Sequence, residues 1–532
     1  MQFPPTSPYP SRRSAVLADN IVATSQPLAA AAGIEMLHRG GNAVDAALAS
    51  AIALTVVEPT GNGIGSDAFA IVWDGAALHG LNASGRAPAA WAPARFGARM
   101  PERGWDSVTV PGAVGAWVAL SERFGTLPFV DLFQPAIRLA ERGFPVSPVI
   151  ATLWARGAAL LADQPGFADH FMPGGRAPAA GERFACPDTA ATLAAIAETR
   201  GEAFYRGALA AKIADWAARH GAALTAEDLA AEAPDWCGTL HGGFDGAELH
   251  EIPPNGQGIA ACMALGILAH TPIRDMAPDE PAAIHLMAEA LRLALADAYA
   301  YVADPAAMGG AGGVETAALL DPAYLAARAA EIDPARAQDR GAGAPRRGGT
   351  VYLATADAQG MMVSFIQSNY SGFGSGVVVP GTGIHLQNRG AGFETTPGHP
   401  NRVGPRKRPF HTIIPGFLMR GGAPAMAFGV MGGPMQAQGH LQMVLRTQLW
   451  GQDVQAAADA PRWRVTEGVG LACETTIPGP TLEALAALGH RLNLEPPDAA
   501  FGFGGAQLIH RLPGGGYAAG SDPRKDGQAI GF

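Results

Sequence analysis

The sequence has 532 residues, of which 48% are hydrophobic and 16% are charged, and its formal net charge is −10. This length predicts one large domain or two to four smaller ones, and it is ample to bury a core. The hydrophobic fraction excludes a disordered protein, and the low charge excludes a coiled coil. Glycine (69) and proline (43) are abundant, but they follow no Gly-X-Y period, which excludes collagen.

The same composition limits the partners and the compartment. An acidic chain with one short basic run, at 402–408, is a poor match for nucleic acid, which needs clustered Lys and Arg. No apolar stretch approaches the ~20 residues of a membrane span, and the polar, Pro-rich start resembles no secretory signal. The four cysteines form no CxxC pair and the 14 histidines form no HExxH motif. We therefore expect a cytoplasmic protein with no metal site, no cofactor and neither a nucleic-acid nor a membrane partner.

The first half of the chain predicts mainly helices. A short strand is expected at 18–24, followed by a helix at 26–38 that Arg39-Gly40-Gly41 ends. Asn42 is suited to cap a second helix at 43–57, which is apolar on all sides and therefore buried. A strand is expected at 68–73, and an Ala-rich helical region extends over 121–270. The amphipathic run 285–302 predicts another helix.

At Thr350 the pattern changes to strands. Residues 330–349 are rich in Ala, Arg, Gly and Pro without an apolar period, which predicts a linker. Strands at 350–357 and 361–368 flank the turn Ala358-Gln359-Gly360 and predict a hairpin. The remaining predictions are strands at 376–379, 413–419, 424–430 and 517–520 and helices at 435–450 and 480–488. Helices and strands mixed in this way favour a layered architecture of helices and sheets.

Thr350 is the first candidate for chemistry. A threonine hydroxyl is a weak nucleophile unless a base lies beside it, and a free α-amine, with a pKa of ~7.7–8.0, is such a base. Cleavage of the Gly349–Thr350 bond would create that amine on the same residue. Taken alone, however, the local pattern favours a simpler interpretation, because β-branched residues commonly begin strands.

Two glycine-rich segments are further candidates. Gly432-Gly433 follows a predicted strand and precedes a helix, so its backbone N–H groups could bind an oxyanion, although a tight turn explains the pair equally simply. The segment 60–67, TGNGIGSD, is not GxGxxG, and it follows a helix and precedes a strand. That order is the reverse of a dinucleotide site, so a nucleotide-dependent oxidoreductase is the weakest alternative.

Six separated blocks together resemble the γ-glutamyltransferase family. They are GGNAVDAALASAIALTVVEPTGNGIGSDAF, PGAVGAW, HLMAEALRLALADA, GPRKRP, GGPMQ and SDPR, in the family's order, from about residue 15 to the C-terminus. The family consists of N-terminal nucleophile hydrolases that cut themselves into two chains. The resemblance therefore implies an α+β fold, the four-layer αββα sandwich, with a large chain 1–349 and a small chain 350–532 in one catalytic domain.

The resemblance also assigns catalytic roles. It makes Thr350 the nucleophile, and Ser368 matches the family hydroxyl that hydrogen-bonds it. Gly432 and Gly433 match the oxyanion-hole glycines. The implied reaction is acyl transfer from an amide through an ester intermediate. The two chains are expected to stay together as a heterodimer, with a dimer of these as a further possibility.

The positions that hold the substrate depart from true γ-glutamyltransferases. The family arginine that clamps the α-carboxylate corresponds to Ser84, with Arg86 two residues on. The acidic residue for the α-amino group corresponds to Gly392 in HLQNRGAGF, which also contains Asn388 and Arg389. Among the further substrate-binding candidates, His411 and Thr412 replace two serines of the family. Tyr370 replaces an asparagine of the family, which Asn369 matches instead if the register slips by one.

A pocket that loses a carboxylate and gains Arg389 suits an anion better than an ammonium group. The motifs also resemble the subgroup containing oxamate amidohydrolases and, less closely, the glutaryl-cephalosporin acylases. The sequence therefore predicts hydrolysis of a small acidic amide without an α-amine, such as oxamate, whose free carboxylate either Arg86 or Arg389 would hold. A genuine γ-glutamyltransferase or glutathione hydrolase and an unprocessed, non-enzymatic homologue are the alternatives.

Several of these residues also have purely structural interpretations. Arg389 could be a solvated loop residue, and Arg86 could pair with Glu58 or Asp67. His411 could be a core histidine and Tyr370 could simply pack. Outside the site, Glu289 and Arg292 are predicted to form a surface pair, and Asp522 is predicted to hold nearby backbone amides.

Overall fold

Two seven-stranded sheets organise the computed structural model, which describes residues 13–309, 313–340, 349–497 and 502–532. The first sheet has the order β1 (Val16–Ala18), β20 (Tyr517–Ser521), β19 (Gly505–Arg511), β15 (Ala423–Met431), β14 (Gly416–Arg420), β9 (Ala247–Glu251) and β8 (Leu240–Phe244). The second has the order β21 (Gln528–Gly531), β2 (Ile21–Thr24), β10 (Gly349–Ala356), β11 (Met362–Tyr370), β3 (Asp67–Trp73), β4 (Leu78–Ala83) and β7 (Asp235–Trp236). The strands named as neighbours in both sheets pair antiparallel.

The predicted hairpin at Thr350 lies at the centre of the second sheet, and its side chains alternate between two apolar layers. Tyr352 and Ala354 of β10 pack with Phe417 and Ala427 of the first sheet. The residues that alternate with them, Val351 and Leu353, pack instead among helices. Because β10 is covered on both faces, its residues 350–356 are all buried and mostly apolar.

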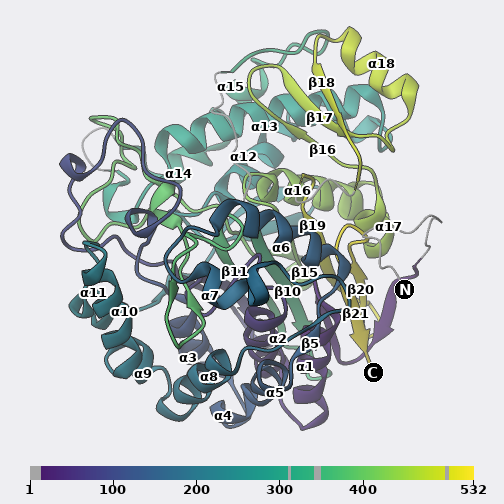
Figure 1. Ribbon diagram of the computed structural model, residues 1–532. Helices are drawn as coiled ribbons and strands as arrows, with labels where there is room; N and C mark the ends of the chain where they lie inside the picture. The colour runs from purple at the N-terminus through teal and green to yellow at the C-terminus, as the bar shows by residue number, and fades with distance from the viewer. Residues whose placement is uncertain (1–12, 310–312, 341–348, 498–501) are drawn as a thin grey trace.

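Helices cover the outer face of each sheet, which completes four layers (Figure 1). The second sheet is covered by helices that precede Tyr205, chiefly α1 (Pro27–His38), α2 (Ala43–Val57), α3 (Ala113–Phe124), α5 (Gln134–Arg142), α6 (Pro148–Leu161) and α8 (Pro187–Thr199). The first sheet is covered by α12 (Gly258–Leu268), α13 (Pro281–Tyr301), α16 (Met435–Val444) and α17 (Val454–Asp459). The layers confirm the predicted α+β sandwich.

A smaller sheet extends beyond the helices that cover the first sheet. Its strands are β16 (Trp463–Val465), β17 (Gly470–Glu474) and β18 (Arg491–Glu495), and α18 (Gly479–Ala487) lies beside them over α13 (Figure 1). This cover makes the predicted surface pair on α13 wrong. Glu289 and Arg292 are fully buried, and the Arg292 guanidinium donates to Glu289 Oε1 at 2.6 Å and to the Gly470 carbonyl at 2.8 Å.

Most other predicted elements are present, with shifted ends. Helix α2 has the predicted bounds because Asn42 and Asp45 form a capping box at its start. The strand expected at 413–419 begins only at Gly416, because the backbone at His411 bonds to Asn255 and Gln257 instead. The strand expected at 376–379 is limited to β12 (Val378–Val379). Asp522 accepts from the Ala506 and Arg524 amides, as predicted.

Other predictions concern the linker and the surface. Residues 341–348 of the expected linker lie outside the described residues, whereas Ala337 in its first part is held by a 2.7 Å hydrogen bond to the Leu488 carbonyl.

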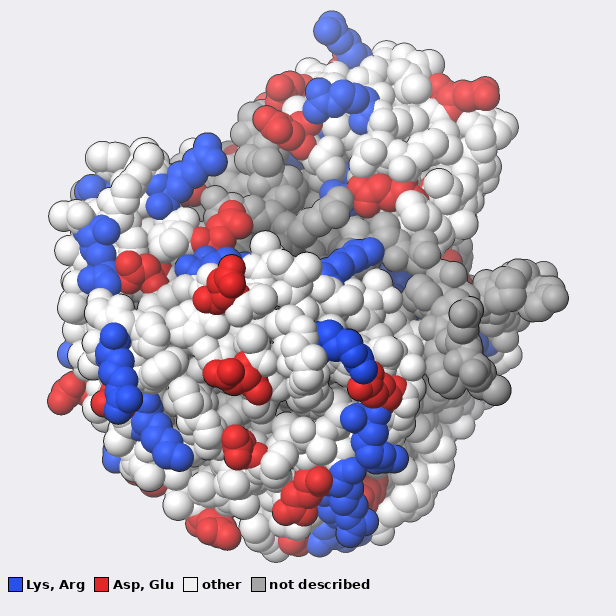
Figure 2. Space-filling model, viewed as in Figure 1, with Lys and Arg blue, Asp and Glu red and all other residues white. Residues whose placement is uncertain are grey.

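All four cysteines are free. Among the described helices, none combines the length and the hydropathy that a membrane span requires. Figure 2 shows basic and acidic side chains interspersed over the visible face.

Candidate active site

Thr350 lies in an irregular part of the central sheet. In the continuous chain it is fully buried, and the pairing of β10 with β11 shifts register between Gly349 and Val351. Such a bulge re-aims the side chain that it carries. The Thr350 hydroxyl lies 3.1 Å from Ser368 Oγ and 3.5 Å from Gln436 Nε2. The register shift and these contacts bring the predicted nucleophile and its predicted hydroxyl partner together.

Arg389 joins this hydroxyl pair to the neighbouring loops. Its guanidinium donates to Ser368 Oγ and to Thr412 Oγ1, each at 2.8 Å, and lies 4.6 Å from the ring centre of Tyr370. Arg389 is only 1% exposed, so the interpretation as a solvated loop residue is wrong. Its Nε atom has no acceptor among the described residues. The site therefore contains a buried cation that is linked to the Thr350 hydroxyl through one intervening side chain, that of Ser368.

An acidic residue and a histidine complete the electrostatics around Arg389. Asp67 Oδ2 lies 3.1 Å from His411 Nε2, and both side chains are fully buried. Burial raises the pKa of Asp67 to about 7, partly opposed by Arg389 and by the amides of Gly85 and Gly112. Burial and the nearby arginines hold the pKa of His411 well below its usual range, so His411 is neutral at pH 7. Burial also lowers the pKa of Arg389, to about 10, which leaves it protonated.

A cavity of about 300 Å³ lies beside these residues. Tyr370 and Thr412 line it next to Arg389, and Pro434 lines it next to the Gly432-Gly433 turn. The rest of its wall mixes apolar and aromatic residues with polar ones: Ala98, Met100, Tyr299, Ala391, Gly392, Phe393 and Phe410 beside Arg99, Thr395 and Asn401. Glu394, which also lines the cavity, is exposed. The space can hold a small organic ligand next to the buried cation.

The two glycines of the predicted oxyanion hole form a turn with unusual backbone angles. Gly432 and Gly433 both have positive φ, 123° and 61°, which side chains rarely adopt. They immediately precede α16, whose N-terminus carries the positive end of the helix dipole. No acceptor among the described residues takes a hydrogen bond from either amide. The turn is therefore suited to bind a negatively charged oxygen.

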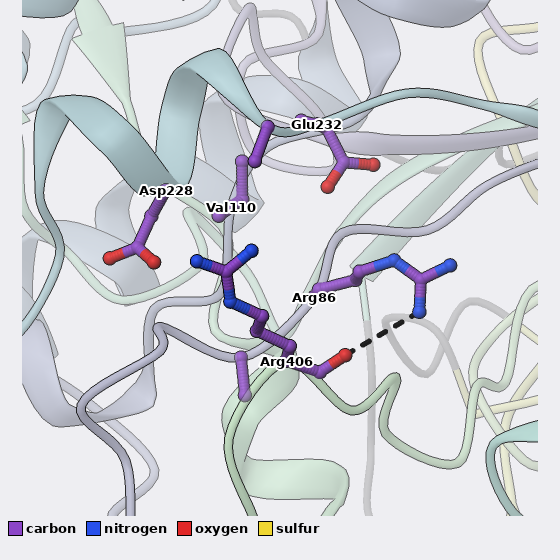
Figure 3. A pocket seen from close by; sticks show the side chains of 7 residues that line it. Arg86, Val110, Asp228, Glu232 and Arg406 are labelled. Atoms are coloured by element: carbon purple, nitrogen blue, oxygen red, sulfur yellow. Dashed lines mark hydrogen bonds between the residues drawn. The ribbon is translucent and has the colours of Figure 1, made fainter. Parts of the chain in front are cut away.

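Arg86 lies elsewhere. It lines a separate cavity of about 280 Å³ with Asp228, Glu232 and Arg406 (Figure 3), and its guanidinium donates to the Arg406 carbonyl. Its acidic neighbours are Asp235 at 3.4 Å and Asp304 at 3.8 Å, and neither Glu58 nor Asp67 appears among its described ion pairs. Figure 3 shows Arg86 pointing away from Asp228 and Glu232.

The Asn388 side chain is buried and hydrogen-bonds backbone groups of neighbouring loops. Its side chain donates to the Glu102 carbonyl at 2.7 Å and accepts from the Ser371 amide at 3.0 Å. It therefore holds the loops around the site, and it is absent from the residues that line the cavity.

Sequence reasoning missed three polar residues of this site. Asp67 ends the glycine-rich segment 60–67, which packs directly on Thr350: a Cβ on Gly61 would lie 3.2 Å from the Thr350 carbonyl oxygen. Gln257 donates to the carbonyls of Thr412 and Gly433, and Gln436 contacts Thr350. The glycine density and the GGPMQ block were the available signals, and neither was connected to the nucleophile.

Comparison with known proteins identifies the family. The sequence profile of the γ-glutamyltranspeptidase family matches residues 29–532. The chain belongs to this family. Its members include amide-bond hydrolases, and this chain is an enzyme of that type.

Individual members of the γ-glutamyltranspeptidase family match over the full length. A glutathione hydrolase-like proenzyme of Bacillus subtilis is 34% identical, covering 98% of this chain and 100% of that protein. An oxamate amidohydrolase proenzyme of Klebsiella pneumoniae is also 34% identical, covering 95% of this chain and 97% of that protein. A cephalosporin acylase from Bacillus halodurans, whose crystal structure is known, is 46% identical in sequence. Its structure matches with a TM-score of 0.95 over 100% of this chain and 99% of that chain. The structural likeness confirms the fold.

Proposed function

We propose that the chain is an autoprocessed amide hydrolase with Thr350 as nucleophile, acting on a small acidic amide such as oxamate. The observation that carries the proposal is the fully buried Arg389, whose guanidinium bonds Ser368 next to Thr350 and contacts Tyr370 and Thr412, which line the cavity. The relatives of this chain include the proenzymes of an oxamate amidohydrolase and of a glutathione hydrolase-like protein. Cleavage at Gly349–Thr350 would leave two chains, 1–349 and 350–532, that form one enzyme.

The proposed reaction follows from the positions of the groups. The free α-amine of Thr350 takes the hydroxyl proton while Oγ1 attacks the amide carbon. The resulting oxyanion accepts hydrogen bonds from the Gly432 and Gly433 amides, and Ser368 orients the hydroxyl. The amine then delivers its proton to the leaving nitrogen, which departs as ammonia from oxamate. Water attacks the ester, and oxalate leaves with Thr350 restored.

The charges of the site favour an anionic acyl group. Arg389 stays protonated at neutral pH, and His411 stays neutral. The cavity wall has Gly392 where the family resemblance expects an acid for the α-amino group, and Glu394 is exposed. A carboxylate can therefore pair with Arg389, in part through Nε, whereas an ammonium group would lie beside a buried cation. Of the two arginines predicted to bind the substrate carboxylate, we assign this role to Arg389.

A longer acidic acyl group is the second candidate. The cephalosporin acylase from Bacillus halodurans matches this chain at 46% identity, and the cavity has room beyond the few atoms of oxamate. Both candidates require the same anion contact and the same nucleophile, and they differ only in the length of the acyl group. The predicted cytoplasmic location and the higher oligomeric state stay predictions.

A substrate panel tests the proposal. The purified, cleaved enzyme is supplied with oxamate, a glutaryl anilide and a γ-glutamyl anilide, and the released ammonia or aniline is measured. Faster turnover of oxamate or of the glutaryl amide than of the γ-glutamyl amide is expected, because only the last carries an α-ammonium group. Equal or faster turnover of the γ-glutamyl anilide would contradict the anionic specificity and favour glutathione hydrolysis, with Glu394 as the group to mutate.

A further inference from the structure

A cluster of three metal-ligand side chains lies under the small three-stranded sheet, away from the proposed nucleophile. His285 and Glu289 stand four residues apart on α13, and His490 precedes β18. All three are buried, and one ligand atom from each lies within 4.8 Å of the others. Sequence spacing could not show this cluster, because His285 and His490 are 205 residues apart.

The surroundings orient His285 for ligation. Its Nε2 lies 2.9 Å from the Asp333 carbonyl oxygen, which can only accept, so Nε2 must carry the hydrogen. The Nδ1 atom therefore carries a lone pair and no hydrogen, and it lies 2.9 Å from His490 Nε2. A second hydrogen bond that fixes the tautomer in this way is typical of metal-binding histidines.

Glu289 is held so that one oxygen remains available. Its Oε1 accepts from Arg292 Nη1 at 2.6 Å and from the Gln338 amide at 3.4 Å. Its Oε2 is buried and has no hydrogen-bond partner among the described residues. A buried carboxylate oxygen without a partner is costly. Arg292 is itself fixed on the Oε1 side, because it also donates to the carbonyls of Gly468 and Gly470.

We propose that His285 Nδ1, Glu289 Oε2 and His490 Nε2 bind one Zn²⁺ ion, with solvent as the fourth ligand. Two imidazole nitrogens and one carboxylate oxygen form a ligand set that zinc commonly takes. The ion replaces the hydrogen between the two histidines, so His490 carries its hydrogen on Nδ1 and no net proton is lost. The alternative is a plain hydrogen-bonded histidine pair that binds no metal.

The position gives such an ion a structural role. It would join α13 to the segment before β18, and the Asp333 and Gln338 backbone groups that orient its ligands belong to the segment that leads toward residue 349. If the chain is cut at Gly349–Thr350, which rests on the proposed function, two ligands come from the large chain and one from the small chain. Zinc binding itself does not depend on that cleavage.

Metal content tests the proposal directly. The full-length protein, purified without a metal-binding tag, is stripped with a chelator, titrated with Zn²⁺, desalted and analysed by mass spectrometry for metal. About one equivalent should be retained, with a higher thermal midpoint than the stripped protein. His490→Ala should lose the bound zinc, with affinity at least ~100-fold lower. Glu289→Gln, which keeps the side-chain volume, tests the same loss in case His490→Ala does not fold.

His440→Gln is the matched control. His440 is equally buried and pairs with Glu251 at 2.5 Å, but no metal-ligand cluster of described residues contains it, so this variant should retain zinc. Cobalt substitution gives an independent readout, because tetrahedral Co²⁺ bound by two imidazoles and a carboxylate absorbs visible light. Wild-type protein that retains less than about a tenth of an equivalent, or His490→Ala that retains as much as wild type, would overturn the proposal.

Discussion

At the level of single residues, Arg389 is the side chain that we expect to determine the preference for an anionic substrate. It is a buried cation bonded to Ser368 and to Thr412, and Thr412 lines the cavity. Replacement by Gln removes a charge-assisted contact with the substrate carboxylate, so we expect the KM for oxamate to rise ~10–100-fold. Steady-state kinetics of Arg389→Gln beside Arg86→Gln measures this. Arg86 lies in the other cavity, and a larger effect from Arg86→Gln would reverse the assignment.

The pH dependence of anion binding follows from Asp67. Its raised pKa, about 7, means that it is neutral below this pH and ionised above it. Ionised Asp67 offsets the charge of Arg389, so the affinity for oxalate should fall as the pH rises from 6 to 8. The Thr350 amine titrates in the same range, so the informative comparison is Asp67→Asn, which should show a shallower fall. Calorimetric titration with oxalate measures both proteins, and identical pH profiles would exclude a role for Asp67.

At the scale of the element, the turn between β15 and α16 should matter for catalysis rather than for binding. A side chain on Gly432 would force a φ of 123° to change and so move the amides that are proposed to bind the oxyanion. We expect Gly432→Ala to lower kcat ~10²–10³-fold with little change in KM. Gly360→Ala is the control, because Gly360 also has positive φ, 98°, but lies in open space at the hairpin turn. An equal loss of kcat in both variants would point to general destabilisation.

Local signals were sufficient for much of the fold, whereas the proposed roles of Thr350 and Ser368 came from the resemblance to the family. The capping box at Asn42 set the start of α2, and the hairpin around Gly360 placed Thr350 opposite Ser368. Long-range packing decided the rest. Helical spacing showed that Glu289 and Arg292 are neighbours, but not that a distant sheet covers them. In the same way, Asp67 meets His411 across 344 residues, which no local pattern reveals.

At the scale of the whole molecule, the predicted cleavage would divide both sheets between two chains. In the second sheet, β2, β3 and β4 precede Thr350, whereas β10, β11 and β21 follow Gly349 or include it. Each chain would therefore keep its sheet partners only in the complex. We expect the two fragments to co-elute in native size-exclusion chromatography and to separate only in denaturant. Separate elution under native conditions would be inconsistent with these shared sheets.

The most direct test of the central claim is the intact mass of the denatured protein, measured for wild type and for Thr350→Ala. We expect two wild-type fragments, with masses that correspond to residues 1–349 and 350–532, and one uncut chain for the variant. A single uncut chain in both proteins would contradict the central claim, because Thr350 would then have no free amine to act as its base.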